Sequence, residues 1–325
     1  MFTVGEERGT TGLVRASSPW NLVFQREVWR KMAKDSNVAT GFMRCLRGHE
    51  PPPGARDPYN RRVSAAHRKW SQHWLVNDDL ASALVRLIGP RPGERFVEIG
   101  PGQGIMTRAL LEHSVALSAI EVDPQCCALL TRTGTGKDLT VIHGDVLQSD
   151  PSSLGIESPV RLVGNLPYAI SSPILRWTVE HRASFIDAHF MLPEDVADRA
   201  LAPAGSSARG LLSVLVQWEY EGETLRRLGP GAFRPPPKID SSFVRLRRHA
   251  PPACGASLVH RDAVLQAAFL ARRKTLANSL QQGGWARATV EKACSAAGID
   301  PGLRAQALSV EQFARLVEEI PEETP

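Results

Sequence analysis

The chain is poor in cysteine, with five in 325 residues, and no two of them stand at CxxC spacing. An odd number of thiols without His-rich neighbours argues against a disulfide framework or a metal site and is typical of a reducing compartment. The sequence also lacks any run approaching the roughly 18 apolar residues of a membrane span, and its first residues lack the apolar core of a secretory signal. We therefore expect a cytoplasmic protein with no membrane partner. The cysteines are Cys45, Cys126, Cys127, Cys254 and Cys294.

Internal repeats are absent too, and the composition is that of an ordinary globular protein, with 42% hydrophobic and 22% charged residues. This length leaves room for one full domain and a smaller one. The net charge of +5 and the pI of about 9.1 favour an acidic partner such as nucleic acid, although many basic proteins bind none.

Residues 1–66 read poorly as structure, because the stretch Glu50–Arg62 is rich in Pro, Gly and Arg. We expect a loosely ordered N-terminal extension. A transit peptide is disfavoured because such presequences are poor in acid, whereas this one contains Glu6, Glu7 and Glu27. A true start near Met43 or later is an equally good explanation.

The pattern changes at Asn77, where Asp78–Ile88 carries apolar residues at helical spacing and is closed by Gly89-Pro90. Short apolar runs follow, with helical patterns between several of them. Strands that alternate with helices predict a parallel, doubly wound sheet, which we place in a domain of residues 67–250. The predicted strands are Arg95–Ile99, Val115–Val122, Leu139–His143, Val160–Val163 and Ala188–Leu192.

Two later segments, Leu211–Tyr220 and Ser241–Leu246, are rich in β-forming residues and predict an antiparallel pair that completes the sheet. After Pro251-Pro252 the pattern is helical to the end. We therefore expect a small helical domain over residues 251–325.

A glycine-rich turn follows the first predicted strand. Gly100, Gly102 and Gly104 fall at alternate positions, unlike the GxGxxG spacing of a dinucleotide site. Glycines let the backbone approach a ligand closely. The second strand ends near Glu121, where doubly wound folds bind ribose hydroxyls; a solvated acid is the alternative.

The third strand ends at Asp145, whose carboxylate can accept a hydrogen bond from an adenine amine. These successive strand ends resemble the Rossmann-like class I S-adenosylmethionine methyltransferases. The resemblance implies that Gly100, Gly102, Glu121 and Asp145 bind S-adenosylmethionine.

The fourth strand leads into Asn165-Leu166-Pro167-Tyr168. An exocyclic adenine amine is a poor nucleophile, and hydrogen-bond acceptors aimed at its protons would make its nitrogen more nucleophilic. Asn165 can offer its side-chain carbonyl and Leu166 its backbone carbonyl, which Pro167 restrains. Tyr168 offers a ring on which an extruded base can stack. In isolation the tetrapeptide would read as an ordinary turn.

The longer string from Asn165 to Leu175, the string from Phe233 to Leu246 and the string from Arg272 to Leu280 resemble the KsgA-type ribosomal-RNA adenine dimethyltransferases. The resemblance starts near Arg68. It implies that the chain dimethylates two adjacent adenosines near the 3′ end of 16S rRNA, with a role in biogenesis of the small subunit. It also implies that His73 and Leu75 line the cofactor entrance and that Asn165 serves cofactor and target.

The chain departs from the pattern of this family at Ser71, Trp74 and Ala169, where Gly, Phe and often Asn are usual. These departures affect the expected shape of the N-terminal segment more than the chemistry, since Trp74 is still aromatic and Ala169 lies outside the tetrapeptide.

Basic residues near two turns are suited to hold RNA phosphates, and a solvated surface is their alternative interpretation. They are Arg234, Lys238, Arg272, Arg273 and Lys274. The helical tail would then dock on the small ribosomal subunit. We expect a monomer that needs no metal. An erythromycin-resistance type methylase of 23S rRNA and a non-catalytic assembly or transcription factor are the open alternatives.

Overall fold

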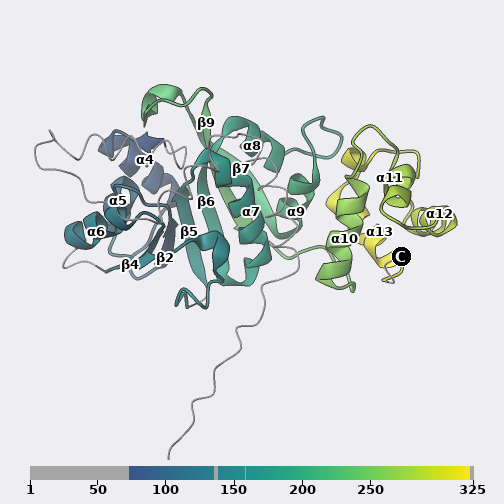
Figure 1. The fold of residues 1–325 in the computed structure, drawn as a ribbon, viewed down its shortest axis with the longest axis horizontal. Helices are drawn as coiled ribbons and strands as arrows, with labels where there is room; N and C mark the ends of the chain where they lie inside the picture. The colour runs from purple at the N-terminus through teal and green to yellow at the C-terminus, as the bar shows by residue number, and fades with distance from the viewer. Residues whose placement is uncertain (1–72, 135–137, 158, 323–325) are drawn as a thin grey trace, which may run out of the picture. The chain divides into compact units, whose positions relative to one another are not determined.

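The computed structural model describes residues 73–134, 138–157 and 159–322, drawn in colour in Figure 1. The expected N-terminal extension of residues 1–66 lies outside these ranges, and so does Ser71. The first long helix, α4 (Asp78–Ile88), has the predicted bounds. Its start is capped by the Asn77 side chain, which accepts a hydrogen bond from the Leu80 backbone, and it ends at Gly89 in the left-handed conformation.

A seven-stranded sheet forms the centre of the fold, with the strand order β4-β3-β2-β5-β6-β9-β7. The first five strands in this order run parallel to one another, and β9 runs antiparallel to both of its neighbours, β6 and β7. The doubly wound sheet predicted from the sequence is therefore confirmed. The strands are β2 (Arg95–Ile99), β3 (Ala116–Glu121), β4 (Leu139–His143), β5 (Val160–Asn165), β6 (Phe185–Pro193), β7 (Tyr220–Leu228) and β9 (Ser241–Arg248).

The prediction of a strand at Leu211–Tyr220 is wrong, because Leu211–Glu219 is the helix α9. The antiparallel pair is made by β7 and β9 instead. Six of the nine residues in LLSVLVQWE are apolar, and a short apolar run of this kind does not separate a buried helix from a buried strand. Its helical start is set by Gly210, whose backbone N–H donates to Ser213 Oγ at 2.9 Å.

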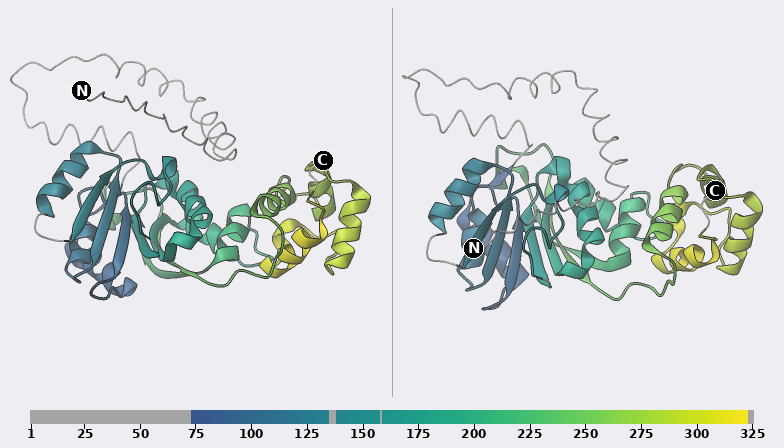
Figure 2. Two further views of the ribbon diagram at one scale, coloured as in Figure 1. Left: turned by 90° about the horizontal axis from the view of Figure 1, so that it is seen from below. Right: turned by 60° about the horizontal axis from the view of Figure 1, so that its bottom comes forward.

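Apolar side chains alternate along the strands and build a separate cluster on each face of the sheet. Phe96 and Val163 pack on one face with α4 and α5 (Ile105–Leu111). Val97 and Leu162 pack on the other face with α7 (Ser171–Glu180) and α9. Both views in Figure 2 show the sheet flanked by helices.

A separate two-stranded ribbon is formed by β1 (Trp74–Leu75) and β8 (Phe233–Arg234), in which Trp74 lies opposite Arg234. Two further α-helices of the sheet region are α6 (Pro124–Thr133) and α8 (Glu194–Ala200). The 3-10 turns of the described residues are Val146–Gln148, Tyr168–Ile170, Arg182–Ser184, Pro230–Ala232 and Ala305–Ala307.

Four helices follow β9, and they confirm the helical pattern expected after Pro252. Their buried apolar residues continue the cluster that covers the α7 and α9 face. Arg261 reaches back to Glu219 at the end of α9, with Nη1 2.9 Å from Oε1. The boundary near residue 250 stays a prediction. The helices are α10 (Leu258–Ala268), α11 (Leu276–Gln282), α12 (Arg287–Ala296) and α13 (Val310–Glu319).

Candidate active site

The glycine-rich turn lies directly after β2, at the carboxyl edge of the parallel strands. Gly100, Gly102 and Gly104 have φ values of +65°, +56° and +78°, in the left-handed region that favours glycine. A Cβ added to Gly102 would lie 3.0 Å from the indole nitrogen of Trp74. The glycines therefore permit both the curvature of this turn and the close approach of Trp74.

A cleft of about 640 Å³ opens beside this turn. It brings together four residues that the sequence placed in the site, namely Leu75, Gly100, Asn165 and Arg234. Glu121 and Asp145 are not among its lining residues. The other lining residues are Trp74, Val76, Asp78, Glu98, Pro101, Gln103, Ile105, Met106, Arg108, Leu129, Thr133 and Pro235.

Glu121 lies at the end of β3 and is 1% exposed. Its Oε2 accepts a hydrogen bond from Gly102 N at 3.0 Å, and its Oε1 accepts from Val122 N and Asp123 N at 2.8 and 2.9 Å. Burial raises the pKa of this carboxyl above its ordinary value, although the three N–H donors act in the opposite direction. In this structure Glu121 therefore fixes the glycine turn, and its role toward a ribose stays a prediction.

Asp145 follows the neighbouring strand β4 and lies close to Glu121 along the sheet edge. Gly144 N donates to Glu121 O at 3.0 Å, which joins the two strand ends. The Asp145 carboxylate caps the next turn by accepting from Leu147 N at 3.0 Å. The half-buried Asp145 is held in one orientation, as a residue that recognises an adenine would need to be.

The tetrapeptide that the sequence predicts to be catalytic begins with Asn165, the last residue of β5. Its Nδ2 donates to the backbone carbonyl of His73 at 2.9 Å, so Oδ1 stays available as an acceptor. Leu166 is buried, with its N–H bonded to Met191 O at 3.3 Å. No hydrogen bond among the described residues ends on Leu166 O, the second acceptor that the sequence predicted.

Tyr168 is held from two sides. Its hydroxyl lies 2.5 Å from Ser241 Oγ at the start of β9, and its ring centroid lies 4.8 Å from that of His73. Burial raises the pKa of Tyr168, with the Ser241 hydrogen bond acting against it, so the phenol is neutral at physiological pH. A base that stacks on Tyr168 must therefore share this ring with His73 or displace it.

His73 ties the segment before β1 to the proline-rich loop after β8. Its Nδ1 lies 2.7 Å from Pro235 O, while its backbone carbonyl holds Asn165. The β1–β8 ribbon continues this connection. Leu75 lines the cleft, and His73 contacts two residues that line it, Asn165 and Pro235; the cofactor-entrance role expected for both stays a prediction.

Glu98 is a cleft residue that the sequence interpretation missed. It is 2% exposed, and its Oε2 accepts a hydrogen bond from Thr107 Oγ1 at 2.6 Å. Burial raises the pKa of Glu98 from the ordinary 4.5 to about 7; the Thr107 hydrogen bond lowers it, and the nearby charge of Glu121 raises it further. The only signal in the sequence was an acid inside an otherwise apolar buried strand.

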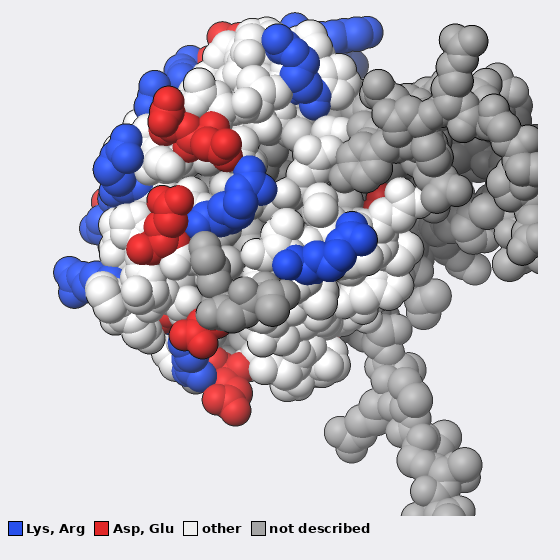
Figure 3. Space-filling view, turned by 90° about the vertical axis from the view of Figure 1, so that its left-hand side faces the viewer, with Lys and Arg blue, Asp and Glu red and all other residues white. Residues whose placement is uncertain are grey.

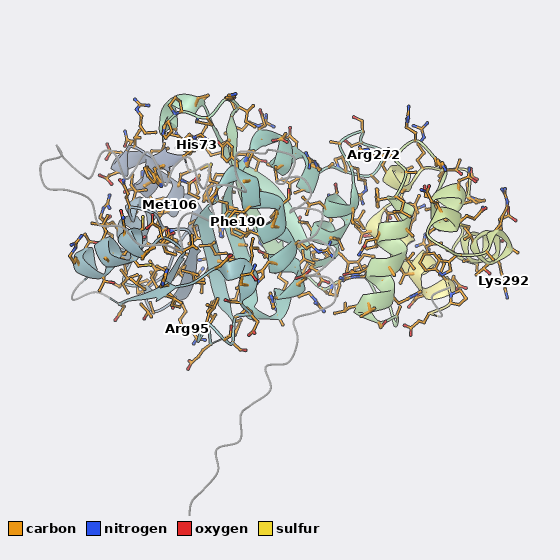
Figure 4. The ribbon with its side chains drawn as sticks, viewed as in Figure 1. His73, Arg95, Met106, Phe190, Arg272 and Lys292 are labelled. Atoms are coloured by element: carbon orange, nitrogen blue, oxygen red, sulfur yellow. The ribbon has the colours of Figure 1, made fainter. Side chains whose placement is uncertain are left out.

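The predicted RNA-binding residues fall in two places. Arg234 and Lys238 are exposed and belong to β8 and the loop that follows it. Arg272, Arg273 and Lys274 lie in the turn between α10 and α11. Figure 4 shows Arg272 well away from His73. Arg272 Nη2 donates to Ser207 O at 2.5 Å, so part of its guanidinium has a structural role.

Surface charge does not by itself mark an RNA site on the side of the molecule seen in Figure 3, where Lys and Arg are interspersed with Asp and Glu. Among residues 73–134, 138–157 and 159–322, no cluster of three or more His, Cys, Asp or Glu could hold a metal ion. Within the same ranges, no helix is both long and apolar enough to cross a membrane.

Comparison with known proteins gives a consistent result. Residues 63–322 match the family described as ribosomal RNA adenine dimethylase. The chain is 43% identical over 258 residues to the ribosomal RNA small subunit methyltransferase A of Xanthomonas campestris pv. campestris (strain B100), covering 77% of this chain and 95% of that protein. A protein of the same name from Xanthomonas euvesicatoria pv. vesicatoria (strain 85-10) is 43% identical over 254 residues, with the same coverages.

Solved structures agree on the fold. The 23S rRNA methyltransferase ErmE is 26% identical with a TM-score of 0.59, covering 76% of this chain and 99% of that one. A dimethyladenosine transferase from Plasmodium falciparum is 22% identical with a TM-score of 0.61, covering 75% and 96%. The class I methyltransferase fold expected from the sequence is confirmed, and the chain belongs to the ribosomal RNA adenine dimethylase family.

Proposed function

We propose that this protein dimethylates the N6 amines of two adjacent adenosines near the 3′ end of small-subunit rRNA, with S-adenosylmethionine as the methyl donor. The observation that carries the proposal is the position of Asn165, at the end of β5 and in the same cleft as Gly100. Membership of the family and the name of the 43% identical relatives support the substrate class. The number of methyl groups and the nucleotides rest on the family resemblance.

The residues present fit a nucleoside-containing cofactor. The cleft, at about 640 Å³, has the size of a site for a small organic ligand. The three left-handed glycines give a turn in which the backbone carries no Cβ at alternate positions, so a ligand can approach it closely, and Glu121 and Asp145 stand at the ends of adjacent strands. We assign Gly100, Gly102, Glu121 and Asp145 to the cofactor, with His73 and Leu75 at its entrance.

S-adenosylmethionine, when bound, supplies a methyl group on a positively charged sulfur. The task of the chain is to make the adenine amine a better nucleophile. Asn165 Oδ1 and Leu166 O would accept its two protons, since Asn165 Nδ2 is already committed to His73. Holding donor and acceptor in one geometry supplies much of the rate. Tyr168 would support the extruded base, a contact worth roughly 1–3 kcal/mol.

The RNA partner would be held mainly through phosphates. Arg234 borders the cleft, so it is suited to the strand next to the target base, together with Lys238. Arg272, Arg273 and Lys274 lie on the C-terminal helices, which we assign to docking on the small subunit. We propose that a monomer carries out this activity in the cytoplasm, during biogenesis of the small subunit.

A 23S rRNA methylase is the second candidate, because ErmE shares the fold at 26% identity. A non-catalytic assembly factor is the third, and the intact glycine turn and tetrapeptide disfavour it. Protein-free 23S rRNA and small-subunit particles, offered as alternative substrates, separate the first two candidates.

The test is methyl transfer from labelled S-adenosylmethionine to small-subunit particles that lack this modification, followed by nucleoside analysis of the digested RNA. Label in N6,N6-dimethyladenosine is expected. Asn165→Ala should lose about 10²–10³-fold in rate, as when an oriented hydrogen-bonding group is removed from an active site, while its circular dichroism spectrum stays that of the parent. Full activity of this variant would disprove the assigned role of Asn165.

A further inference from the structure

Glu98 and Glu121 form a pair of buried carboxyl groups behind the cofactor turn. They are 2% and 1% exposed and belong to the adjacent strands β2 and β3, whose residues lie in register from Arg95 and Ala116 onward. Two like charges this deep in the protein repel each other with little screening. One of the two groups therefore favours its neutral form.

The hydrogen bonds identify which group that is. Glu121 accepts three backbone N–H bonds, all of which stabilise a carboxylate. Glu98 accepts one, from the Thr107 hydroxyl, and its Oε1 has no hydrogen-bond partner in the described part of the chain. Glu121 is thus the better-stabilised anion, and Glu98 is the group that holds a proton.

Glu98 is also the member of the pair that faces the cleft, since it lines the hollow and Glu121 does not. The groups around it come from every neighbouring element: Thr107 and Arg108 from α5, Glu121 from β3, and Asp78 from α4 across the cleft. Arg108 is committed to Asp78, with Nη2 2.9 Å from Oδ1. No cation of the described residues pairs with Glu98, so a cation could be supplied by the ligand.

We propose that Glu98 is a neutral acid in the free enzyme and becomes a carboxylate when S-adenosylmethionine binds, so that the site prefers the sulfonium donor over its neutral thioether product. This inference rests on the cofactor assigned under the proposed function. The methyl donor carries one more positive charge at sulfur than the product S-adenosylhomocysteine. An ionised Glu98 favours that charge, and a protonated Glu98 does not. The proton leaves to solvent on binding.

The preference should depend on pH in a defined direction. Burial places the pKa of Glu98 at about 7 in the free protein, and a cation in the cleft lowers it. Below that pH, binding of the sulfonium must also remove a proton. If the cation lowers the pKa by one unit, the ratio Kd(S-adenosylhomocysteine)/Kd(S-adenosylmethionine) is therefore expected to rise by about fivefold between about pH 6 and 8.

The experiment is calorimetric titration of the full chain with each ligand from about pH 6 to 8, in buffers of different ionisation enthalpy. The sulfonium lowers the pKa of the donor's amino group relative to that of the product, so the pH profile of the ratio is compared with that of Glu98→Gln, in which the ligands titrate and position 98 does not. Proton release with S-adenosylmethionine should exceed that with S-adenosylhomocysteine near pH 6.5 by about half a proton per site. Glu98→Gln should flatten the ratio and remove the excess release.

Two further variants keep the test decisive. Glu112→Gln removes an exposed acid that does not line the cleft and should preserve the rise of the ratio with pH. Thr107→Val removes the hydroxyl that favours the ionised form of Glu98, so the rise should move to higher pH. A flat ratio in the wild-type protein, or the same rise in Glu98→Gln, overturns the inference and leaves the proposed function intact. Failure of both ligands to bind overturns both.

Discussion

The side-chain amide of Asn165 donates a hydrogen bond to the backbone carbonyl of His73, 92 residues earlier in the chain, at 2.9 Å. This bond joins the end of β5 to the segment before β1, and it fixes which atom of the amide is left for the substrate. His73 in turn contacts the Tyr168 ring and the carbonyl of Pro235. The tetrapeptide is therefore held in place by the N-terminal segment as well as by its own strand.

The ring and the hydroxyl of Tyr168 should contribute differently. Tyr168→Phe keeps the ring and loses only the bond to Ser241, so methyl transfer should stay within about tenfold of the parent, as expected for one neutral hydrogen bond. Tyr168→Ala loses the stacking surface, and its kcat/KM should be lower than that of the parent by roughly 10–100-fold. Steady-state kinetics on small-subunit particles measure both. Equal losses in the two variants would show that the hydroxyl, and not the ring, matters.

Arg272 and Arg273 should differ although they are adjacent and basic. Arg272 donates to Ser207 O, which joins the α10–α11 turn to the loop before α9, whereas no hydrogen bond or ion pair of Arg273 occurs among the described residues. Arg273→Ala should weaken binding to small-subunit RNA and lower the slope of log K against log salt by about 1, as for one phosphate contact, without a change in unfolding free energy.

Arg272→Ala should in addition destabilise the fold by about 1 kcal/mol, the usual cost of a lost hydrogen bond. Filter binding at several salt concentrations and urea unfolding measure the two effects. If Arg273→Ala leaves the salt slope unchanged, this turn does not contact phosphate.

A buried arginine with two carboxylate partners stabilises the end of the sheet that lies opposite the cleft. Arg161 is 11% exposed in its side chain and bonds to Asp187 and Glu94 at 2.8 and 2.9 Å. Arg161→Met leaves two partly buried carboxylates without their cation and should lower the unfolding free energy by roughly 3–5 kcal/mol. Arg95→Met is the matched control, because its pair with Glu157 is solvent-exposed and should matter by no more than about 1 kcal/mol.

Urea unfolding at neutral pH measures this difference. Similar losses in the two variants would mean that the buried pair contributes no more than an exposed one.

The sequence predicted the sheet and the strand-end residues well for a physical reason. Strands buried on both faces appear as short apolar runs, and the chemistry of a doubly wound fold lies where those runs end. The positions of Glu121, Asp145 and Asn165 at or just after strand ends could thus be predicted one by one, and their roles stay predictions. The helix α9 could not be distinguished from a strand, because a short apolar run does not separate the two.

Contacts between distant segments are harder to predict, because no local pattern encodes them. The bond between Asn165 and His73 and the meeting of Tyr168 with Ser241 both depend on how the chain returns to the sheet edge. Glu98 was missed for a related reason: its raised pKa comes from burial and from neighbours on β3 and α5.

The buried position of Glu98 also predicts how stability depends on pH. A carboxyl whose pKa rises from 4.5 to about 7 on folding holds its proton more tightly in the folded state. The stabilisation from that proton is complete below about pH 4.5 and is lost as the pH rises through 7. Glu98→Gln cannot ionise, so its unfolding free energy should rise relative to that of the wild-type protein over this range. The relative increase should be at most about 3 kcal/mol (2.5 pKa units). Urea unfolding of the ligand-free proteins between about pH 5 and 8 measures the difference, with the exposed Glu112→Gln as a control that should show no such trend. A constant difference between Glu98→Gln and the wild type across this range would mean that Glu98 is ionised throughout, and that burial beside the carboxylate of Glu121 does not hold it neutral.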